Sequence, residues 1–400
     1  MFNKKTVFIL GAGASWHYNY PTGADLVKCI IEKATELADR LASNSIHIKW
    51  RNNLTEYFDE KFSEYYQEGQ DGVDYLRNFI DRINHVDPPV IDYFLDWNSD
   101  WQEIGQMMIS WVILDREREF EENKRNGNHQ RLVDQNPNPK NRYLVDAKQC
   151  DDNWYRFILY KMLSDCLLYQ DFIQENHVHF ITFNYDVSLE TYLYRGLKQI
   201  QFMKSGDMQA DQIKECLVDK FTHMYGSLKN NPYQGAVSVI KDTRNFHDNF
   251  KDYVDTLDEI YQASRGIRTI GSFKKNDNVI QFAQKKIEEA EDVYILGYGF
   301  DESNNKRLGL KDLLSLGGLN QGKQPGDVGV KKNVYFTNFC DHNSVNKKAG
   351  KALVNDTARF LQDKSKIYVP ESHYPHVVHT YYEKSIKNVY DALEQDFDFI

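Results

Sequence analysis

The first patterned segment of the chain is an apolar run that stops at a glycine turn. Thr6–Leu10 has the composition of a buried strand, and Gly11-Ala12-Gly13-Ala14-Ser15 follows it directly. Glycines after a strand let the backbone turn tightly and bring N–H groups against a diphosphate. The dehydrogenase fingerprint has a third glycine where this chain has Trp16. The turn alone is therefore also compatible with an ordinary strand-to-helix connection.

Further buried-strand patterns follow at intervals and alternate with helical ones. A helix is expected over Asn278–Ala290, and a closing helix from about Thr380 to Leu393. The expected strands after the first are His177–Thr182, Lys220–Tyr225, Val293–Leu296, Asn333–Thr337 and Lys366–Val369. Strands that alternate with helices are typical of a parallel sheet with helices on both faces. We therefore predict a doubly wound α/β fold.

A long helical segment separates the first two expected strands. Apolar residues recur at steps of three and four over Trp101–Val112 and over Trp154–Met162. Glu121–Arg142 lacks an apolar period and is expected to be a polar loop. We predict that residues 28–176 form a large helical insertion in an α/β domain built from residues 1–27 and 177–400.

Composition narrows the class of protein. The chain has 400 residues with 41% hydrophobic content, and its formal net charge of -10 argues against unaided binding of nucleic acid. Its five cysteines are isolated, and it has neither a signal-peptide core nor a run long enough to cross a membrane. We therefore expect a soluble, cytoplasmic protein with reduced thiols and no direct contact with nucleic acid or membrane.

Polar residues and glycines follow the later strands, at the edge where open α/β sheets bind ligands. In chain order they are Asn184 and Asp186, then His223 with Tyr225-Gly226-Ser227, then Gly297 with Gly299, and finally Asn338. Asn184 and Asp186 are also in place to cap a helix that starts near Val187. His223 is a candidate acid or base because the pKa of histidine lies near neutrality, and taken alone it also fits a structural role.

Together and in this order, the motifs resemble those of the sirtuin-like NAD-binding superfamily, which has a Rossmann-like fold. The resemblance implies that Gly11-Ala12-Gly13-Ala14-Ser15 and Pro21 form the diphosphate loop. It matches Asn184 and Asp186 to the family's Thr-x-Asn-x-Asp element. In that element the asparagine orients the nicotinamide ribose or the attacking water, and the aspartate region holds the carboxamide.

The remaining motifs extend the resemblance along the chain. Gly226-Ser227 resembles the turn that follows the family's catalytic histidine, and Gly297-Tyr298-Gly299 resembles the turn near the second ribose. Asn338 resembles the asparagine that contacts the adenosine ribose. Pro89–Leu95, within the predicted insertion, resembles a stretch of sirtuin-like proteins from bacterial anti-phage systems.

The chain departs from lysine-deacylating sirtuins in its cysteines. Those enzymes carry a structural zinc module with two Cys-x-x-Cys pairs, and this chain has no Cys-x-x-Cys. We therefore expect no zinc or other metal, and deacylation becomes a disfavoured activity. His373, His376 and His379 recur every third residue around Pro375, and we expect a surface segment there rather than metal ligands.

A second departure concerns the catalytic base. Tyr225 stands at the position where the family usually has its histidine, and tyrosine, with an ordinary pKa of about 10, is a poor base at neutral pH. His223 lies two residues earlier, which would place both side chains on one strand face. Either His223 acts from this shifted position, or the reaction relies on Asn184 and the leaving group. We predict that His223 transfers the proton and that Tyr225 shapes the pocket.

The resemblance implies an NAD hydrolase, with NAD as substrate and with nicotinamide and ADP-ribose, or a cyclic form of it, as products. An unregulated enzyme of this kind would deplete its own cell of NAD. We therefore expect control by assembly into a homo-oligomer or by a separate protein. Stand-alone sirtuin-like chains of this size accompany HerA-like ATPases, so the resemblance implies an NAD-depleting effector of abortive anti-phage defence.

Two other functions stay open at this point. The chain could be a non-catalytic module that binds NAD or ADP-ribose within a larger complex, and Tyr225 favours that interpretation. A zinc-independent protein deacylase is the second alternative. The absence of the zinc module disfavours it.

Overall fold

The computed structural model describes most of the chain. The described residues are 1–18, 20–43, 48–126, 153–200, 210–228, 250–269, 277–314, 332–337, 343–353, 376–380 and 393. The expected strand Lys366–Val369, the expected closing helix up to Leu393 and the site residue Asn338 lie outside these ranges, except that Thr380 and Leu393 are described.

A parallel sheet organises the described residues. In spatial order its six strands are β3 (Phe221–His223), β2 (Val178–Thr182), β1 (Thr6–Leu10), β4 (Asp292–Leu296), β5 (Lys332–Phe336) and β6 (His376–Thr380). Every neighbouring pair of strands is parallel. The order 3-2-1-4-5-6 is that of the Rossmann fold, so the predicted α/β class with a Rossmann-like parallel sheet is confirmed.

The central strand β1 is buried along its whole length, as its unbroken apolar run predicts. Phe8 stacks on Phe180 of β2 and on Tyr294 of β4, with ring centroids 5.2 Å and 5.0 Å apart. These ring contacts join the strands on one face of the sheet.

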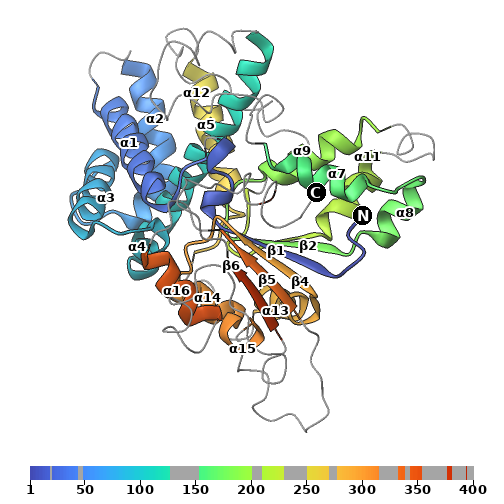
Figure 1. Cartoon of the computed structure of the whole chain (residues 1–400). Coiled ribbons are helices and arrows are strands. Elements are labelled where there is room, and N and C mark those ends of the chain that lie inside the picture. The colour runs from blue at the N-terminus through green and yellow to red at the C-terminus, as the bar shows by residue number, and fades with distance from the viewer. Residues whose placement is uncertain are drawn as a thin grey trace, which may run out of the picture.

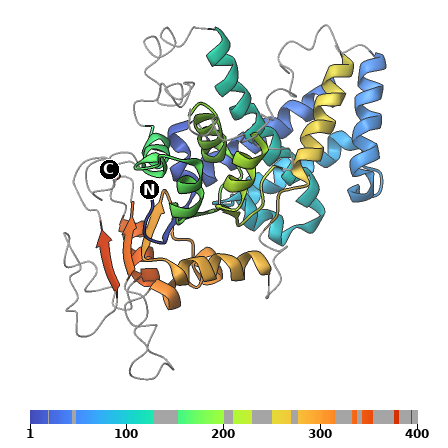
Figure 2. The same cartoon turned by 90° about the vertical axis from the view of Figure 1, so that its right-hand side faces the viewer.

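Helices cover both faces of the sheet (Figures 1 and 2). On one face, Glu190 of α9 (Ser188–Leu197) contacts His223 of β3. On the other face, Phe282 of α13 (Asn278–Glu289) contacts the ring of His179 of β2. Beside α9 lie α7 (Tyr155–Leu163), α8 (Tyr169–Glu175) and α11 (Ala210–Val218). On the side of α13 lie α14 (Glu302–Leu308), α15 (Leu310–Leu314) and α16 (Asn343–Leu353).

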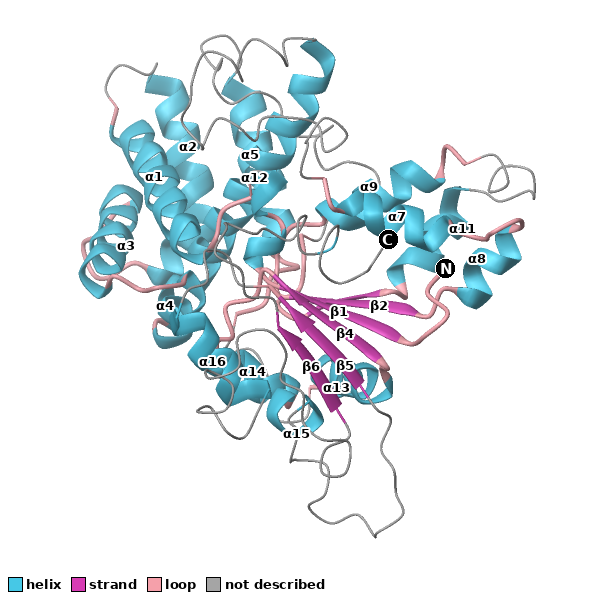
Figure 3. Ribbon diagram, in the orientation of Figure 1, coloured by secondary structure: helices cyan, strands magenta, loops and turns pink. Residues whose placement is uncertain are grey.

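A group of helices lies over the carboxyl ends of the strands (Figure 3). It consists of α1 (Gly23–Ala42), α2 (Ile48–Phe62), α3 (Gly72–Val86), α4 (Ile91–Trp97), α5 (Gln102–Asn126) and α12 (Phe250–Ser264). Short 3₁₀ helices connect parts of the chain at Ala12–Ala14, Trp16–Tyr18, Ser63–Tyr65 and Ser99–Trp101. The apolar period predicted in α5 is confirmed, because Ile104, Met107, Met108, Trp111 and Val112 are all buried.

The helical segment between β1 and β2 divides between two places. Helices α1 to α5 lie over the carboxyl ends of the strands, whereas α7 and α8 pack beside α9 (Figure 1). Helix α12, which follows β3, joins the first group, since Tyr261 donates a hydrogen bond to Glu103 of α5 (3.0 Å) and contacts the ring of Phe62 of α2. Helix α1 also runs through the predicted boundary at residue 28. The division into domain and insertion therefore stays a prediction.

One local expectation is wrong. Helix α5 continues to Asn126, through the start of the predicted polar loop, because the Glu, Arg and Lys residues there favour a helix without any apolar period. His376 and His379 belong to strand β6, which pairs with β5 at one end of the described sheet. The β-branched pair Val377-Val378 between them favours a strand. In the part of the chain described here, no helix is both long and apolar enough to cross a membrane.

Candidate functional site

The ends of the central strands border a cavity of about 530 Å³. It lies between the turns that follow β1 and β4, which is where the strand order reverses and where open α/β sheets bind their ligands. The amino end of α1, α4 and the start of α14 bound the cavity on the side away from the strands. The volume falls within the range of about 300 to 1,000 Å³ that is typical of small-molecule sites.

Most of the site residues predicted from the sequence line this cavity. They are Gly11, Ala12, Gly13, Pro21, Asn184, Asp186, Tyr225, Gly297 and Gly299. Ser15 lies directly behind it, where it accepts a hydrogen bond from Asn184. Gly226 and Ser227 follow Tyr225 in the chain and are not among the lining residues.

The two glycine turns pack backbone against backbone. The Gly11 N–H donates to Leu296 (3.0 Å), and the Gly13 N–H donates to Gly297 (3.0 Å). Gly297 has a φ of +59°, and a Cβ there would lie 2.0 Å from the Ala14 nitrogen. The glycines are therefore required for the close approach of the two turns. The N–H groups of Gly11 and Gly13 serve this contact, so any anion in the cavity must find its donors elsewhere.

The amino end of α1 offers such donors. Thr22, at its N-cap, makes no side-chain capping bond; its hydroxyl donates to Asp25 instead (2.7 Å). Thr22 and Gly23 both line the cavity. A helix of 20 residues carries partial positive charge at this end, and its first N–H groups lack partners within the helix. This end of the cavity is therefore suited to an anionic group.

Asn184 lines the cavity and has a buried side-chain oxygen without a hydrogen-bond partner among the described residues. Its side chain is only 7% exposed, and its amide nitrogen donates to Ser15 Oγ (2.8 Å). Its Oδ1 has no hydrogen-bond partner among the described residues. A buried acceptor without a donor costs about 1 to 3 kcal/mol. A ligand hydroxyl or water that donates to this oxygen would remove that cost.

Asp186 both lines the cavity and caps the start of α9. It is buried and lines the cavity, and its Oδ1 accepts hydrogen bonds from the N–H (3.2 Å) and hydroxyl of Ser188 at the start of α9. Burial raises the pKa of Asp186 above its ordinary value. Asn184, by contrast, makes no bond to α9 through its side chain among the described contacts.

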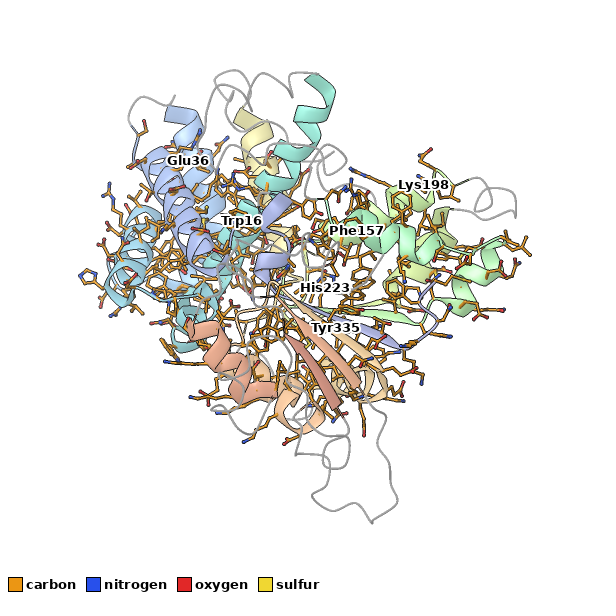
Figure 4. The ribbon with its side chains drawn as sticks, viewed as in Figure 1. Trp16, Glu36, Phe157, Lys198, His223 and Tyr335 are labelled. Atoms are coloured by element: carbon orange, nitrogen blue, oxygen red, sulfur yellow. The ribbon has the colours of Figure 1, made fainter. Side chains whose placement is uncertain are left out.

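His223 lies close to the ends of the strands (Figure 4) but is not among the residues that line the cavity. Its Nε2 is 2.5 Å from Glu190 of α9, and its Nδ1 is 3.5 Å from the Asn184 carbonyl oxygen. Burial opposes the charged ring, but the charge and hydrogen bond of Glu190 outweigh it and raise the pKa of His223. His223 is therefore a buried, charge-paired residue beneath Asn184.

Tyr225 does line the cavity, so the expected common face for His223 and Tyr225 is wrong. The physical reason is that β3 ends at His223, and the chain then turns, so strand alternation does not extend to Tyr225. The Tyr225 hydroxyl donates to Asn304 and accepts from Arg307 (3.3 Å). Burial raises the pKa of Tyr225, which keeps the hydroxyl protonated.

Asp92, which is not among the site residues predicted from the sequence, lines the cavity from α4. Its carboxylate accepts a hydrogen bond from Tyr185, the neighbour of Asn184 in the chain. Burial raises the pKa of Asp92 to about 6. The sequence does contain a sign of this role, because Asp92 is the one charged residue within the otherwise apolar stretch Pro89–Leu95.

Comparison with protein-family models, with curated proteins and with solved structures finds no match to this chain. Among the described residues, no three or more His, Cys, Asp or Glu side chains are grouped so that they could hold a metal ion.

Proposed function

We propose that this cavity binds NAD and that the chain is a sirtuin-like NAD hydrolase, which cleaves the bond between nicotinamide and ribose. One observation carries the proposal. Turns that follow β1, β2, β3 and β4, far apart in the sequence, meet at a single cavity at the switch point of a 3-2-1-4-5-6 sheet. Dinucleotides bind at this point in Rossmann folds.

The cavity offers groups for each part of NAD. The amino end of α1 would hold the diphosphate, whereas the family resemblance places the diphosphate at the glycine turn after β1. By resemblance, Asn184 and Asp186 would hold the nicotinamide ribose and the carboxamide, whereas Gly297 and Gly299 would border the second ribose. Asn338, outside the described residues, would contact the adenosine ribose.

The chemistry requires little beyond positioning. Nicotinamide is already a cationic leaving group, so the protein has to hold the ribose, stabilise an oxocarbenium-like transition state and admit one water. In this scheme Asn184 Oδ1, which has no partner among the described residues, would accept a hydrogen bond from a ribose hydroxyl or from that water. The scheme needs no metal. The product is ADP-ribose or a cyclic form of it.

The biological role follows from the same resemblance. We propose a regulated, NAD-depleting effector of anti-phage defence that acts in the cytoplasm as a homo-oligomer, with a HerA-like ATPase as candidate partner. In this proposal the helices between β1 and β2 are the family's large insertion.

One observation favours a second candidate, a non-catalytic NAD or ADP-ribose binding module. Tyr225 lines the cavity where the family has its histidine, and His223 lies outside it. A zinc-independent deacylase is less favoured, because the sequence has neither of the two Cys-x-x-Cys pairs of the zinc module.

A measurement of NAD turnover distinguishes the NAD hydrolase from the non-catalytic binding module. The purified full chain, with and without the candidate ATPase, is incubated with NAD, and the products are separated by chromatography. We expect equal amounts of nicotinamide and ADP-ribose, or its cyclic form. Binding of ADP-ribose without any release of nicotinamide in either condition would favour the binding module instead.

A further inference from the structure

The cavity contains three carboxylates, and they differ in how fully they are bonded. Asp301 accepts hydrogen bonds at both oxygens, from the Asn304 N–H (3.1 Å) and from the Tyr93 hydroxyl (2.5 Å). Asp186 accepts hydrogen bonds from the backbone N–H and from the hydroxyl of Ser188. Both are therefore structural anchors for the helices that follow them.

Asp92 is different. It is 8% exposed, it lines the cavity, and Tyr185 is the side chain that donates to its Oδ1. Besides Tyr185, the backbone N–H of Asp92 itself is the hydrogen-bonding group that acts on this carboxylate. Because Tyr185 follows Asn184 directly, the bond to Asp92 also links α4 to the loop that carries the unpaired Asn184 oxygen.

We propose that Asp92, rather than His223, is the catalytic base of the cavity. This assignment rests on the proposed cleavage of NAD. In the step, the oxygen of a solvent water bonds to ribose C1′ while the bond between C1′ and the nicotinamide nitrogen breaks. The electron pair of that bond passes to the pyridinium nitrogen, and the proton of the water passes to the Asp92 carboxylate. The carboxylate then releases the proton to solvent.

The surroundings of Asp92 suit this task. Burial raises the pKa of Asp92 to about 6, and the Tyr185 hydrogen bond and the Arg307 charge act in the opposite direction. Asp301 adds a smaller raising effect, and the neutral Tyr225 hydroxyl also faces this region. Asp92 is thus ionised at neutral pH and yet a better proton acceptor than an exposed aspartate. His223 has no comparable access, because Glu190 and the Asn184 carbonyl occupy its ring nitrogens.

The test uses Asp92→Asn, which keeps an acceptor for Tyr185 and removes the proton acceptor. Nicotinamide release should fall by about 10² to 10⁴-fold, while calorimetry shows nearly unchanged affinity for ADP-ribose. In the parent, release should rise with pH through about 6. Tyr185→Phe removes a hydrogen bond that lowers the pKa of Asp92, so this rise should move to higher pH.

Asp115→Asn is the matched control, because Asp115 is a buried carboxylate on α5 that pairs with Lys33 and does not line the cavity. It should lose stability but keep the turnover rate of the folded protein. Full activity of Asp92→Asn with an unchanged pH profile would overturn the assignment and leave the proposed function standing. If Asp92→Asn lowers the affinity for ADP-ribose as much as it lowers nicotinamide release, the assignment of Asp92 as the catalytic base is also overturned. A parent that neither releases nicotinamide nor binds ADP-ribose would end both proposals.

Discussion

Replacing Asn184 with alanine is expected to lower NAD turnover by at least about 100-fold while the fold is kept, since misplacing a reacting group by a small distance costs this much. The change removes one hydrogen bond to Ser15, worth about 1 kcal/mol, together with the unpaired Oδ1. Losing the hydrogen bond lowers the free energy of unfolding, whereas removing the buried, unpaired oxygen raises it. Nicotinamide release and the urea midpoint of unfolding, measured on the same preparation, check the prediction.

Asn176→Ala is the matched control for this substitution. Asn176 is also buried but lies at the other end of the strands, where it accepts a hydrogen bond from Phe2 and donates to Met162 and Phe172. The Asn176→Ala variant should lose more free energy of unfolding than the Asn184→Ala variant, and its NAD turnover should stay at the level of the parent. An Asn184→Ala variant that hydrolyses NAD like the parent would contradict the role of Asn184.

The second large effect is expected in stability. His223→Ala leaves Glu190, which is 4% exposed, as a buried charge without its partner. Breaking a buried pair in this way costs about 3 to 5 kcal/mol of the free energy of unfolding. The double variant Glu190→Leu with His223→Leu removes both charges and should recover most of the loss. Urea unfolding of the parent and both variants measures the difference.

The pH dependence of this effect follows from the direction of the pKa shift. The pKa of His223 is raised in the folded chain, so the pair stabilises the fold fully below the ordinary value of about 6.5. This contribution is lost as the pH rises through the raised pKa. The stability difference between the parent and His223→Gln should therefore shrink at alkaline pH. A difference that grows with pH would show that His223 is not held charged by Glu190.

The positions of the glycine turns and of Asn184 could be predicted because each follows an unbroken apolar run. Such a run identifies a strand buried on both faces, and the carboxyl ends of parallel strands meet at one edge. These inferences use only local pattern and the geometry of a parallel sheet. The requirement for glycine at 297 comes from the structure, in which the turns after the neighbouring strands β1 and β4 pass close together.

Features that depend on distant segments could not be predicted. Asp92 reaches the cavity because α4 packs near the strand ends, and no local period encodes that placement. The direction of Tyr225 relative to His223 depends on where β3 ends, and a strand boundary is set by its neighbours as much as by its own residues. Strand β6 is as long as β1, but its sequence His376-Val377-Val378-His379-Thr380 lacks the unbroken apolar run that marked β1.

The most direct test of the central claim is to locate the bound nucleotide. A second cavity of about 550 Å³ lies at the amino ends of β1 and β2, lined by Lys5, His177, Lys220 and Lys286, among others. Hydrogen–deuterium exchange of the full chain with and without ADP-ribose compares the two cavities. We predict slower exchange in peptides that contain Gly23, Asn184 and Gly297, and no change around Lys220. Protection around Lys220 alone, or none at saturating ADP-ribose, would contradict the claim that the carboxyl-end cavity is the NAD site.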